Sequence, residues 1–262
     1  MANIIRLVGI GVVASLALAG LVGHADAQAE PVPILVELFT SQGCSSCPPA
    51  DAILEMVSKE QPVAGAYVVG MSEHVTYWDH QGWTDPFGSA RFTERQNAYA
   101  FRFKLENIFT PQLVVDGTKQ FVGSDVAALR KALTEAARTP KPPLRIAASF
   151  SDASTLAVSA TGPGLDAGAA EDAQLSWAVT EDGLTVDVKR GENAKRTLRH
   201  AGVVRTLVTR KIDRSRAGES MSAVIPLRAD WKRENLRLVA FVQSTKSMRV
   251  LSVGWTRLGE TR

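Results

Sequence analysis

Cys44 and Cys47 stand three residues apart and are the only cysteines in the 262-residue chain. In disulfide exchange the reacting species is the thiolate, and the free backbone N–H groups and dipole at the start of a helix stabilise it. The spacing lets the second thiol attack a mixed disulfide on the first within one helical turn. The pair is therefore predicted to be a redox couple in which Cys44, the more exposed and more reactive thiol, attacks and Cys47 resolves.

Two other interpretations of this pair stay open. A purely structural disulfide would gain little by closing so short a loop, because loop-closure entropy grows with loop length. Thiolates and imidazole are also ligands for Cu(I) and Zn(II), so Cys44, Cys47 and His80 form an alternative metal site. The chain has no second Cys-x-x-Cys and no His-x3-His run to support it. The redox interpretation requires no bound cofactor.

The cysteines must be positioned by the elements around them. A buried strand is predicted at Ile34–Thr40 and a helix at Ala50–Lys59, with Pro48 and Pro49 tolerated in the first turn. Alternation along this strand places Glu37 on the same face as its neighbours at 35 and 39. Further along we expect a strand at 66–71, an aromatic-rich loop at 72–89, a helix at 90–104, a hairpin turning at 116–117 and a helix at 125–138.

This order of elements resembles the thioredoxin fold. In that fold a cis-proline begins the strand facing the cysteine pair, and Pro111 stands at the matching position. The resemblance implies that Thr110 and Pro111 offer backbone to an extended substrate and that Glu37 is a buried acid carrying protons for the second cysteine. Trp78, in the 72–89 loop, either anchors that loop or forms an apolar lip for a protein substrate.

The sequence departs from the usual thioredoxin pattern at the pair itself. Gly43 replaces the aromatic residue before the first cysteine, and Ser45-Ser46 replaces Gly-Pro between the cysteines. The dipeptide between the cysteines helps to set the redox potential, so the direction of electron flow stays open.

A longer string closely resembles a narrower group, a bacterial secreted thioredoxin-like family catalogued as domain of unknown function 1223. The string is VELFTSQGCSSCPPAD, at residues 36–51. Further similar segments are Tyr77–Asp79, Gly82–Trp83, Asp85–Phe87, Arg95–Gln96 and 191–204. The resemblance implies a shared fold over the whole mature chain and brings no established reaction.

The N-terminus predicts export. Arg6 precedes an apolar run from Leu7 to Val22, and small residues follow up to Ala27, which is typical of a signal peptide at residues 1–27. A membrane anchor is the alternative, but the run is shorter than the roughly 20 apolar residues that a span needs. We therefore expect a secreted or periplasmic protein, without stable membrane insertion, in a compartment where disulfides persist.

Residues 139–143, Thr-Pro-Lys-Pro-Pro, predict a linker. We expect a thioredoxin-like α/β domain at 28–139 and an all-β, antiparallel sandwich-like domain at 140–262. The predicted strands of the second domain are 144–150, 156–160, 175–180, 185–189, 197–209, 221–226, 236–243 and 250–256.

Charge differs between the two parts of the chain. Residues 1–140 carry 10 Lys and Arg against 14 Asp and Glu, whereas residues 141–262 carry 20 against 13. The basic residues are scattered and few aromatics lie among them, which favours a solvated face over a nucleic-acid site. The expected partner is a protein or small-molecule disulfide or thiol. A non-catalytic thioredoxin-like interaction module is the remaining alternative.

Overall fold

Strand β1 (Val32–Thr40) leads directly to the cysteines, and both of its edges are paired. The structure, a computed structural model, describes residues 30–259. β1 runs parallel to β2 (Ala66–His74) and antiparallel to β3 (Gln112–Val115). Every residue of β1 from 34 to 40 is buried, which explains why its sequence is almost continuously apolar.

The other elements of the first half, residues 30–139, follow the predicted order. They are α1 (Pro48–Glu60), η1 (Asp79–Gln81), α2 (Ala90–Phe103), β4 (Lys119–Val122) and α3 (Val126–Ala137). One predicted boundary is wrong, because β2 continues past residue 71 to His74. Glu73 and His74 are therefore fully buried sheet residues and not loop residues.

The second half, residues 140–259, contains most of the predicted strands. Its elements are β5 (Arg145–Phe150), β6 (Thr155–Thr161), α4 (Pro163–Ala170), β7 (Ala173–Glu181), β8 (Leu184–Asp187), β9 (Thr197–His200), β10 (Val203–Lys211), η2 (Arg214–Arg216), β11 (Met221–Pro226), η3 (Arg233–Asn235), β12 (Leu236–Ser244) and β13 (Val250–Arg257).

Two predictions for this half were wrong. The run predicted as one strand at 197–209 is two strands, because Gly202 adopts a left-handed φ of 63° and turns the chain between them. The half is also not all-β, since it contains α4. The sequence of α4, PGLDAGAA, lacks the spaced large apolar residues from which a helical period is recognised.

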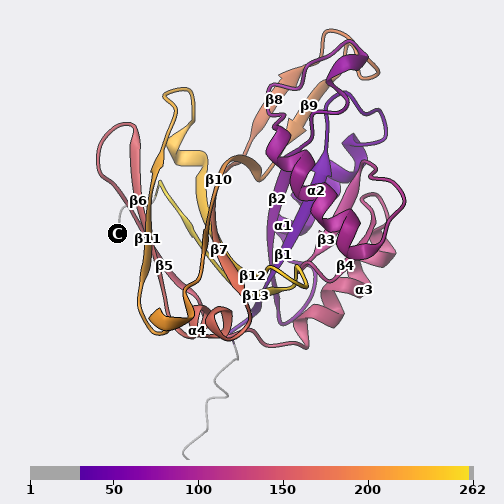
Figure 1. Ribbon diagram of the computed structural model, residues 1–262. Coiled ribbons are helices and arrows are strands. Elements are labelled where there is room, and N and C mark those ends of the chain that lie inside the picture. The colour runs from indigo at the N-terminus through magenta and orange to yellow at the C-terminus, as the bar shows by residue number, and fades with distance from the viewer. Residues whose placement is uncertain (1–29, 260–262) are drawn as a thin grey trace, which may run out of the picture.

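Strands of both halves form one mixed sheet of eight strands, in the order β13-β12-β7-β10-β2-β1-β3-β4 (Figure 1). The junction is between β10 and β2, where Val203 pairs with Ser72 in parallel and the Ser72 N–H donates to the Gly202 carbonyl at 2.8 Å. On the other side of β10, strands β7, β12 and β13 pair antiparallel, as predicted for the second half.

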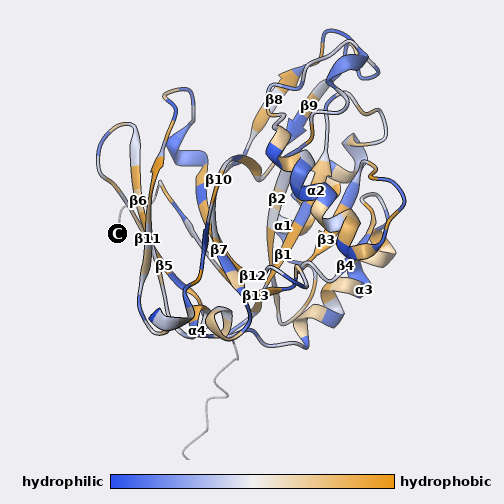
Figure 2. Ribbon diagram, in the orientation of Figure 1, coloured by the Kyte–Doolittle hydropathy of each residue, from blue (hydrophilic) through white to orange (hydrophobic). Residues whose placement is uncertain are grey.

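Two small antiparallel sheets complete the fold among the described residues. The sheet β11-β6-β5 shares an apolar core with β7 and β12, in which Trp177 is fully buried. The sheet β8-β9, drawn at the top of Figure 1, contacts α1 through β9. Figure 2 shows hydrophobic residues along β1 and hydrophilic residues on much of α2.

The two faces of β1 pack against different partners. Val36 and Leu38 belong to a core with α1 and α3. On the opposite face Leu35 shares a core with Phe241 of β12, and Phe39 packs against Tyr99 of α2. Because side chains alternate along a strand, Glu37 lies on the α2 face.

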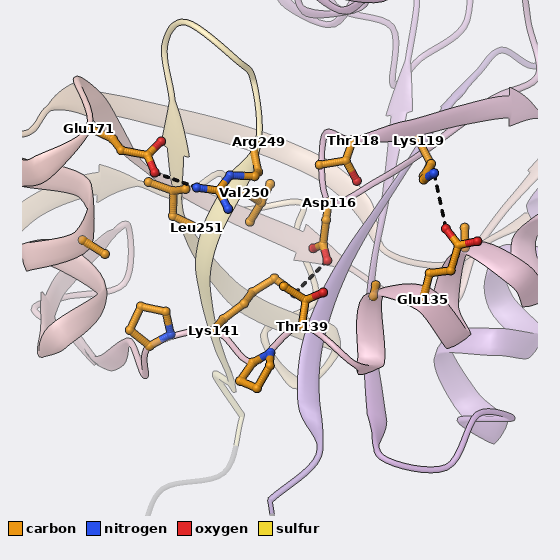
Figure 3. A pocket seen from close by; sticks show the side chains of 15 residues that line it. Asp116, Thr118, Lys119, Glu135, Thr139, Lys141, Glu171, Arg249, Val250 and Leu251 are labelled. Atoms are coloured by element: carbon orange, nitrogen blue, oxygen red, sulfur yellow. Dashed lines mark hydrogen bonds and ion pairs between the residues drawn. The ribbon is translucent and has the colours of Figure 1, made fainter.

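The connection between the halves is held by Lys141. Its ammonium group lies 2.7 Å from the Asp116 carboxylate and donates to the Pro33 carbonyl at 2.9 Å. Both side chains of the ion pair are at most 8% exposed. They border a cavity of about 320 Å³ between the halves, where the other pairs are Lys119–Glu135 and Arg249–Glu171 (Figure 3).

Across residues 30–259, the helices are all too short or too polar to span a bilayer. The signal peptide predicted at residues 1–27 lies outside the described residues.

Gly202→Ala tests the junction between the halves. A Cβ at this position would lie 2.7 Å from the Gly70 carbonyl oxygen, in addition to the cost of the left-handed φ. We expect the free energy of unfolding in urea to fall by about 2–4 kcal/mol. Gly218→Ala is the matched control, because Gly218 also has positive φ (83°) but nothing within 4 Å of its Cβ position, so it should cost only about 1 kcal/mol. Equal losses would contradict a tight junction.

Candidate functional site

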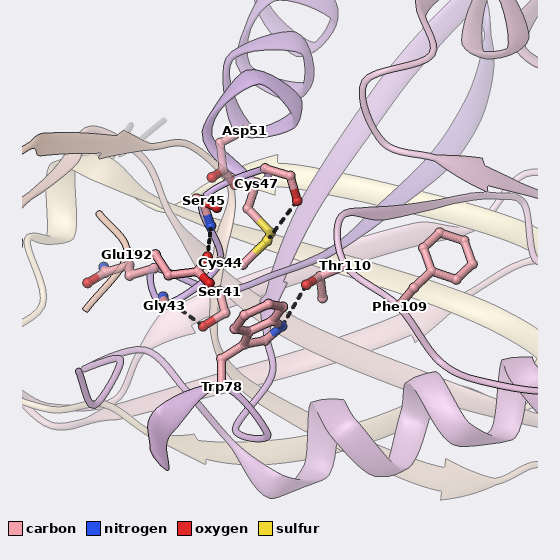
Figure 4. Close-up of a disulfide and its surroundings, with 12 residues drawn as sticks. Ser41, Gly43, Cys44, Ser45, Cys47, Asp51, Trp78, Phe109, Thr110 and Glu192 are labelled. Carbon is pink, nitrogen blue, oxygen red and sulfur yellow. Dashed lines mark hydrogen bonds between the residues drawn. A yellow bond between two sulfur atoms is a disulfide. The ribbon is translucent and has the colours of Figure 1, made fainter. Parts of the chain in front are cut away.

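Cys44 and Cys47 form a disulfide at the junction of β1 and α1 (Figure 4). Cys47 is the N-cap residue of α1, and its carbonyl accepts from the N–H groups of Ala50 and Asp51 at 2.9 and 3.1 Å. The Ser46 hydroxyl lies 3.3 Å from Cys44 Sγ. The pair thus occupies the strand-to-helix position that the sequence predicts, at the positive end of the α1 dipole. Pro48 and Pro49 have no backbone N–H, so the dipole is what favours negative charge there.

Both cysteines are 0% exposed, so the prediction that Cys44 is the more exposed one is wrong for the disulfide form. Trp78 lies on the loop between β2 and η1, and a Cβ on Gly43 would approach Trp78 Cβ to 3.0 Å. Gly43 therefore permits the Trp78 backbone to come close to the cysteine loop. Residues of the second half cover another part of the same loop.

Glu192 and Asn193, in the β8–β9 connection, bind the cysteine loop. The Ser45 N–H donates to the Glu192 carboxylate at 2.9 Å. The buried Asn193 amide donates to the carbonyls of Gln42 and Cys44 at 3.0 and 2.9 Å, and Arg196 holds the other end of this amide at 2.8 Å. Both carbonyl groups therefore accept a hydrogen bond although they lie outside any strand, and these bonds fix the loop in one conformation.

The predicted substrate-facing residues come together. The Trp78 indole N–H donates to the Thr110 hydroxyl at 2.8 Å, and the Thr110–Pro111 peptide bond is cis, as predicted. A Cβ on Gly123 would lie 2.8 Å from Ala50 Cβ and 3.0 Å from Pro111 Cβ, so Pro111 is adjacent to the first turn of α1. Trp78, Thr110 and the disulfide are neighbours in Figure 4.

Glu37 lies elsewhere, on the α2 face of the sheet. Its carboxylate accepts from the Arg95 guanidinium at 2.6 Å and from the Tyr99 hydroxyl at 2.5 Å. Glu73 lies 3.5 Å from the same guanidinium, and burial together with the charge of Glu37 holds the pKa of Glu73 well above its ordinary value. Since α1 covers the opposite face, the role of Glu37 as a proton carrier for Cys47 stays a prediction.

A second buried polar cluster, made of residues outside the predicted site, lies on the α1 side. His74 Nδ1 lies 2.7 Å from an Asp85 oxygen that also accepts from the Gln42 N–H at 2.8 Å. Gln42 Nε2 lies 3.3 Å from Nε2 of His200, at the end of β9. His200 Nδ1 lies 3.8 Å from the Asp51 carboxylate in the first turn of α1. All five side chains are at most 6% exposed.

Within this cluster, His74 and Asp85 shift each other's pKa toward the charged forms. Burial by itself disfavours the imidazolium, but the charge and hydrogen bond of Asp85, with the charge of Asp51, outweigh it and raise the pKa of His74. Burial likewise disfavours the Asp85 carboxylate, but His74 and the N–H groups of Gln42 and Phe87 outweigh it and lower the pKa of Asp85. The pair therefore favours the ionic form.

One signal in the sequence could have found Asp51. It stands four residues after Cys47 within the predicted helix, a spacing that puts two side chains on the same face one turn apart. The contacts of Asn193 and His200 carry no such signal, because they join positions roughly 150 residues apart in sequence.

The alternative metal site is not assembled. His80 is exposed, whereas both cysteines are buried and joined to each other. Within residues 30–259, no three or more His, Cys, Asp or Glu side chains are grouped so that they could hold a metal ion.

Comparison with known proteins identifies one family and two similar solved structures. The family model described as protein of unknown function (DUF1223) matches residues 35–243. The crystal structure of protein AGR_C_4864 from Agrobacterium tumefaciens is 28% identical, covers 89% of this chain and 97% of its own, and has a TM-score of 0.65. HBP35 of Porphyromonas gingivalis is 12% identical, covers 89% and 77%, and has a TM-score of 0.62, a likeness of fold alone. No curated protein sequence matches this chain.

Asp85→Asn should destabilise the protein in a pH-dependent way. The folded-state pKa of His74 lies above 6.5, so its contribution is complete below pH 6.5 and is lost as the pH rises through the folded-state value. The folded-state pKa of Asp85 lies below 3.8, so its contribution is complete above pH 3.8 and is lost as the pH falls through the folded-state value. Between these limits we expect a loss of about 3 kcal/mol in the free energy of unfolding.

Urea unfolding of both proteins from acidic to mildly alkaline pH checks this expectation. The difference between wild type and Asp85→Asn should be largest in mildly acidic solution and should shrink at both extremes. A difference that is constant across pH would mean that His74 and Asp85 form no ionic pair.

Proposed function

We propose that this chain, which belongs to the DUF1223 family, is an extracytoplasmic thiol–disulfide oxidoreductase with a thioredoxin-like fold in its first half. The observation that carries the proposal is the Cys44–Cys47 disulfide at the N-terminus of α1, directly after a central strand. A thiolate there gains stabilisation from the helix dipole, and the three-residue spacing allows one cysteine to resolve what the other has attacked.

The proposed reaction transfers two electrons between this pair and a substrate. With the protein oxidised, a substrate thiolate attacks Cys44 Sγ, the Cys44–Cys47 bond breaks and Cys47 leaves as a thiolate. A second substrate thiolate then breaks the mixed disulfide and releases Cys44. The substrate gains a disulfide, the protein gains two thiols, and the two protons lost by the substrate thiols are taken up, by way of the solvent, by Cys44 and Cys47. The reverse sequence reduces a substrate disulfide.

Ser46 supports Cys44 as the sulfur that carries the mixed disulfide, because Cys44 becomes a thiolate when that bond is broken and attacks as a thiolate in the reverse direction. Its hydroxyl lies 3.3 Å from Cys44 Sγ, within reach for donation to a thiolate. Trp78 and Thr110 would form the substrate-facing wall, with the Thr110 backbone paired to an extended substrate before β3 begins at Gln112.

The second half acts in this proposal as a cover for the reactive pair. Glu192 and Asn193 bind the cysteine loop, and both sulfurs are inaccessible in the disulfide form. A substrate must displace part of this cover, which selects against general thiols. Residues 28–139 and 140–262 are the proposed domains, joined through the common sheet.

Single-cysteine variants test the function. The wild-type protein, incubated with a peptide disulfide or a reduced peptide dithiol, should exchange it, and Cys44→Ala should not. Cys47→Ala should instead accumulate a mixed disulfide through Cys44, because nothing resolves it; mass spectrometry of the acid-quenched reaction measures this species. Ser151→Ala, at an exposed residue of the second half, is the control. Full exchange by Cys44→Ala would refute the oxidoreductase.

Export is part of the same proposal and rests on the apolar run and small residues before Ala27. The protein recovered from the producing bacterium should begin at Gln28 and be found outside the cytoplasm. N-terminal sequencing of the fractionated protein measures both. An uncleaved chain in the cytoplasmic fraction would contradict export, since reducing conditions there would keep the pair as thiols.

A further inference from the structure

A group of buried polar atoms beside α1 has no hydrogen-bond partner. Asp51 Oδ1, His200 Nδ1 and His74 Nε2 are all inaccessible and unpaired among the described residues. Buried polar atoms are normally hydrogen-bonded, so three unpaired atoms in one cluster call for an explanation. All three atoms belong to groups that can take up or release a proton.

This cluster reaches the disulfide through Asp51. Cys47 has helical φ and ψ, and the Asp51 N–H donates to its carbonyl, so the two residues stand one helical turn apart on the same face. Figure 4 draws Asp51 among the side chains that surround the disulfide. Asp51 is 6% exposed and Cys47 is 0% exposed, so solvent has little direct access to the Cys47 sulfur.

We infer that Asp51 and His200 form a buried proton relay for Cys47, taking its proton when it attacks the mixed disulfide and returning one when Cys47 is the leaving group. The inference rests on the proposed function. A thiolate must be formed in a site that excludes water, so its proton needs an acceptor within the protein. The Asp51 carboxylate and the His200 imidazole, 3.8 Å apart, are the groups placed to accept it.

Resolution of the mixed disulfide moves the Cys47 proton into the protein and breaks the Cys44–substrate bond. The Cys47 S–H bond breaks and the proton passes to the Asp51 carboxylate and on to His200. The Cys47 thiolate attacks Cys44 Sγ, the Cys44–substrate bond breaks, and the substrate leaves as a thiolate that takes a proton from solvent. The protein pair is oxidised by two electrons, and the substrate disulfide that began the cycle is reduced to two thiols.

His74 and Asp85 position the relay. The ring of His74 lies 4.8 Å from the ring of His200, centroid to centroid, in an edge-on arrangement, and Asp85 fixes His74 by its 2.7 Å contact. Gln42 fixes the other edge of His200 and is itself held by the Trp83 indole N–H at 3.0 Å. His200 is thus oriented with Nδ1 toward Asp51.

Other charged groups also face the relay and enter its pH dependence. Asp79 accepts from the Asp85 N–H, and Arg205 of β10 lies over the Phe87 ring that contacts both histidines. Arg196 holds Asn193 beside the cysteine loop. The measurement must therefore compare variants across pH and not at one value.

The test follows the mixed disulfide between the reduced protein and oxidised glutathione. Samples are acid-quenched across a range of pH, and mass spectrometry gives the rate at which Cys47 resolves the adduct on Cys44. We expect Asp51→Asn to slow resolution about 10²-fold at neutral pH. The rate should recover as the pH rises, because hydroxide then removes the Cys47 proton directly. His200→Gln should act in the same direction.

Two further variants make the test specific. Asp116→Asn replaces another buried aspartate, one that binds Lys141 and the Leu35 N–H, and should leave resolution unchanged. Glu37→Gln examines the other buried acid. The relay is wrong if Asp51→Asn and His200→Gln both resolve the adduct at the wild-type rate at every pH. It is also wrong if Glu37→Gln is the one variant that resolves the adduct slowly. The absence of any adduct in the wild-type protein and in Cys47→Ala would instead refute the proposed function.

Discussion

The pairing of β10 with β2 is the contact on which the rest of the site depends. It is short, with Val203 opposite Ser72 and one backbone hydrogen bond from Ser72 to Gly202. Yet it sets the position of everything just before it in sequence, including His200 at the end of β9 and Asn193 in the connection that precedes β9. This junction therefore fixes both the residue that covers the cysteine loop, Asn193, and the imidazole buried beside it, that of His200.

Strand β2 also separates two buried ionic groups. His74 points to the α1 side and joins Asp85, whereas its neighbour Glu73 points to the α2 side and joins Arg95. Adjacent residues on a strand face opposite ways, so the two clusters are insulated from each other by the sheet. The α1-side cluster includes Asp51 of α1, the helix whose N-cap is Cys47, and this shared helix is the basis on which we propose Asp51 as the acid for Cys47.

Local sequence patterns predicted much of the first half, because strand β1, helix α1 and the β3–β4 hairpin each carry their own signals. The apolar run before Cys44, the prolines at 48 and 49 and the Asp116-Gly117 turn belong to these elements. The cover could not be predicted, since Asn193 meets Cys44 only through tertiary contact. The same reason explains why the predicted exposure of Cys44 was wrong for the disulfide form. Exposure depends on what packs over a loop, and Trp78 and Asn193 are distant from Cys44 in sequence.

The anchoring of Lys141 limits how this molecule can move. Its ion pair with Asp116 and its bond to Pro33 hold the chain at the point where one half passes into the other, and a rotation of the halves would break these contacts together with the β2–β10 pairing. Exposure of the disulfide then requires movement of the Trp78 side chain and of the loop that carries Asn193. Such local motions belong to the nanosecond-to-microsecond range, faster than hinged domain opening, so in the proposed exchange reaction access to the sulfurs is not the slow step.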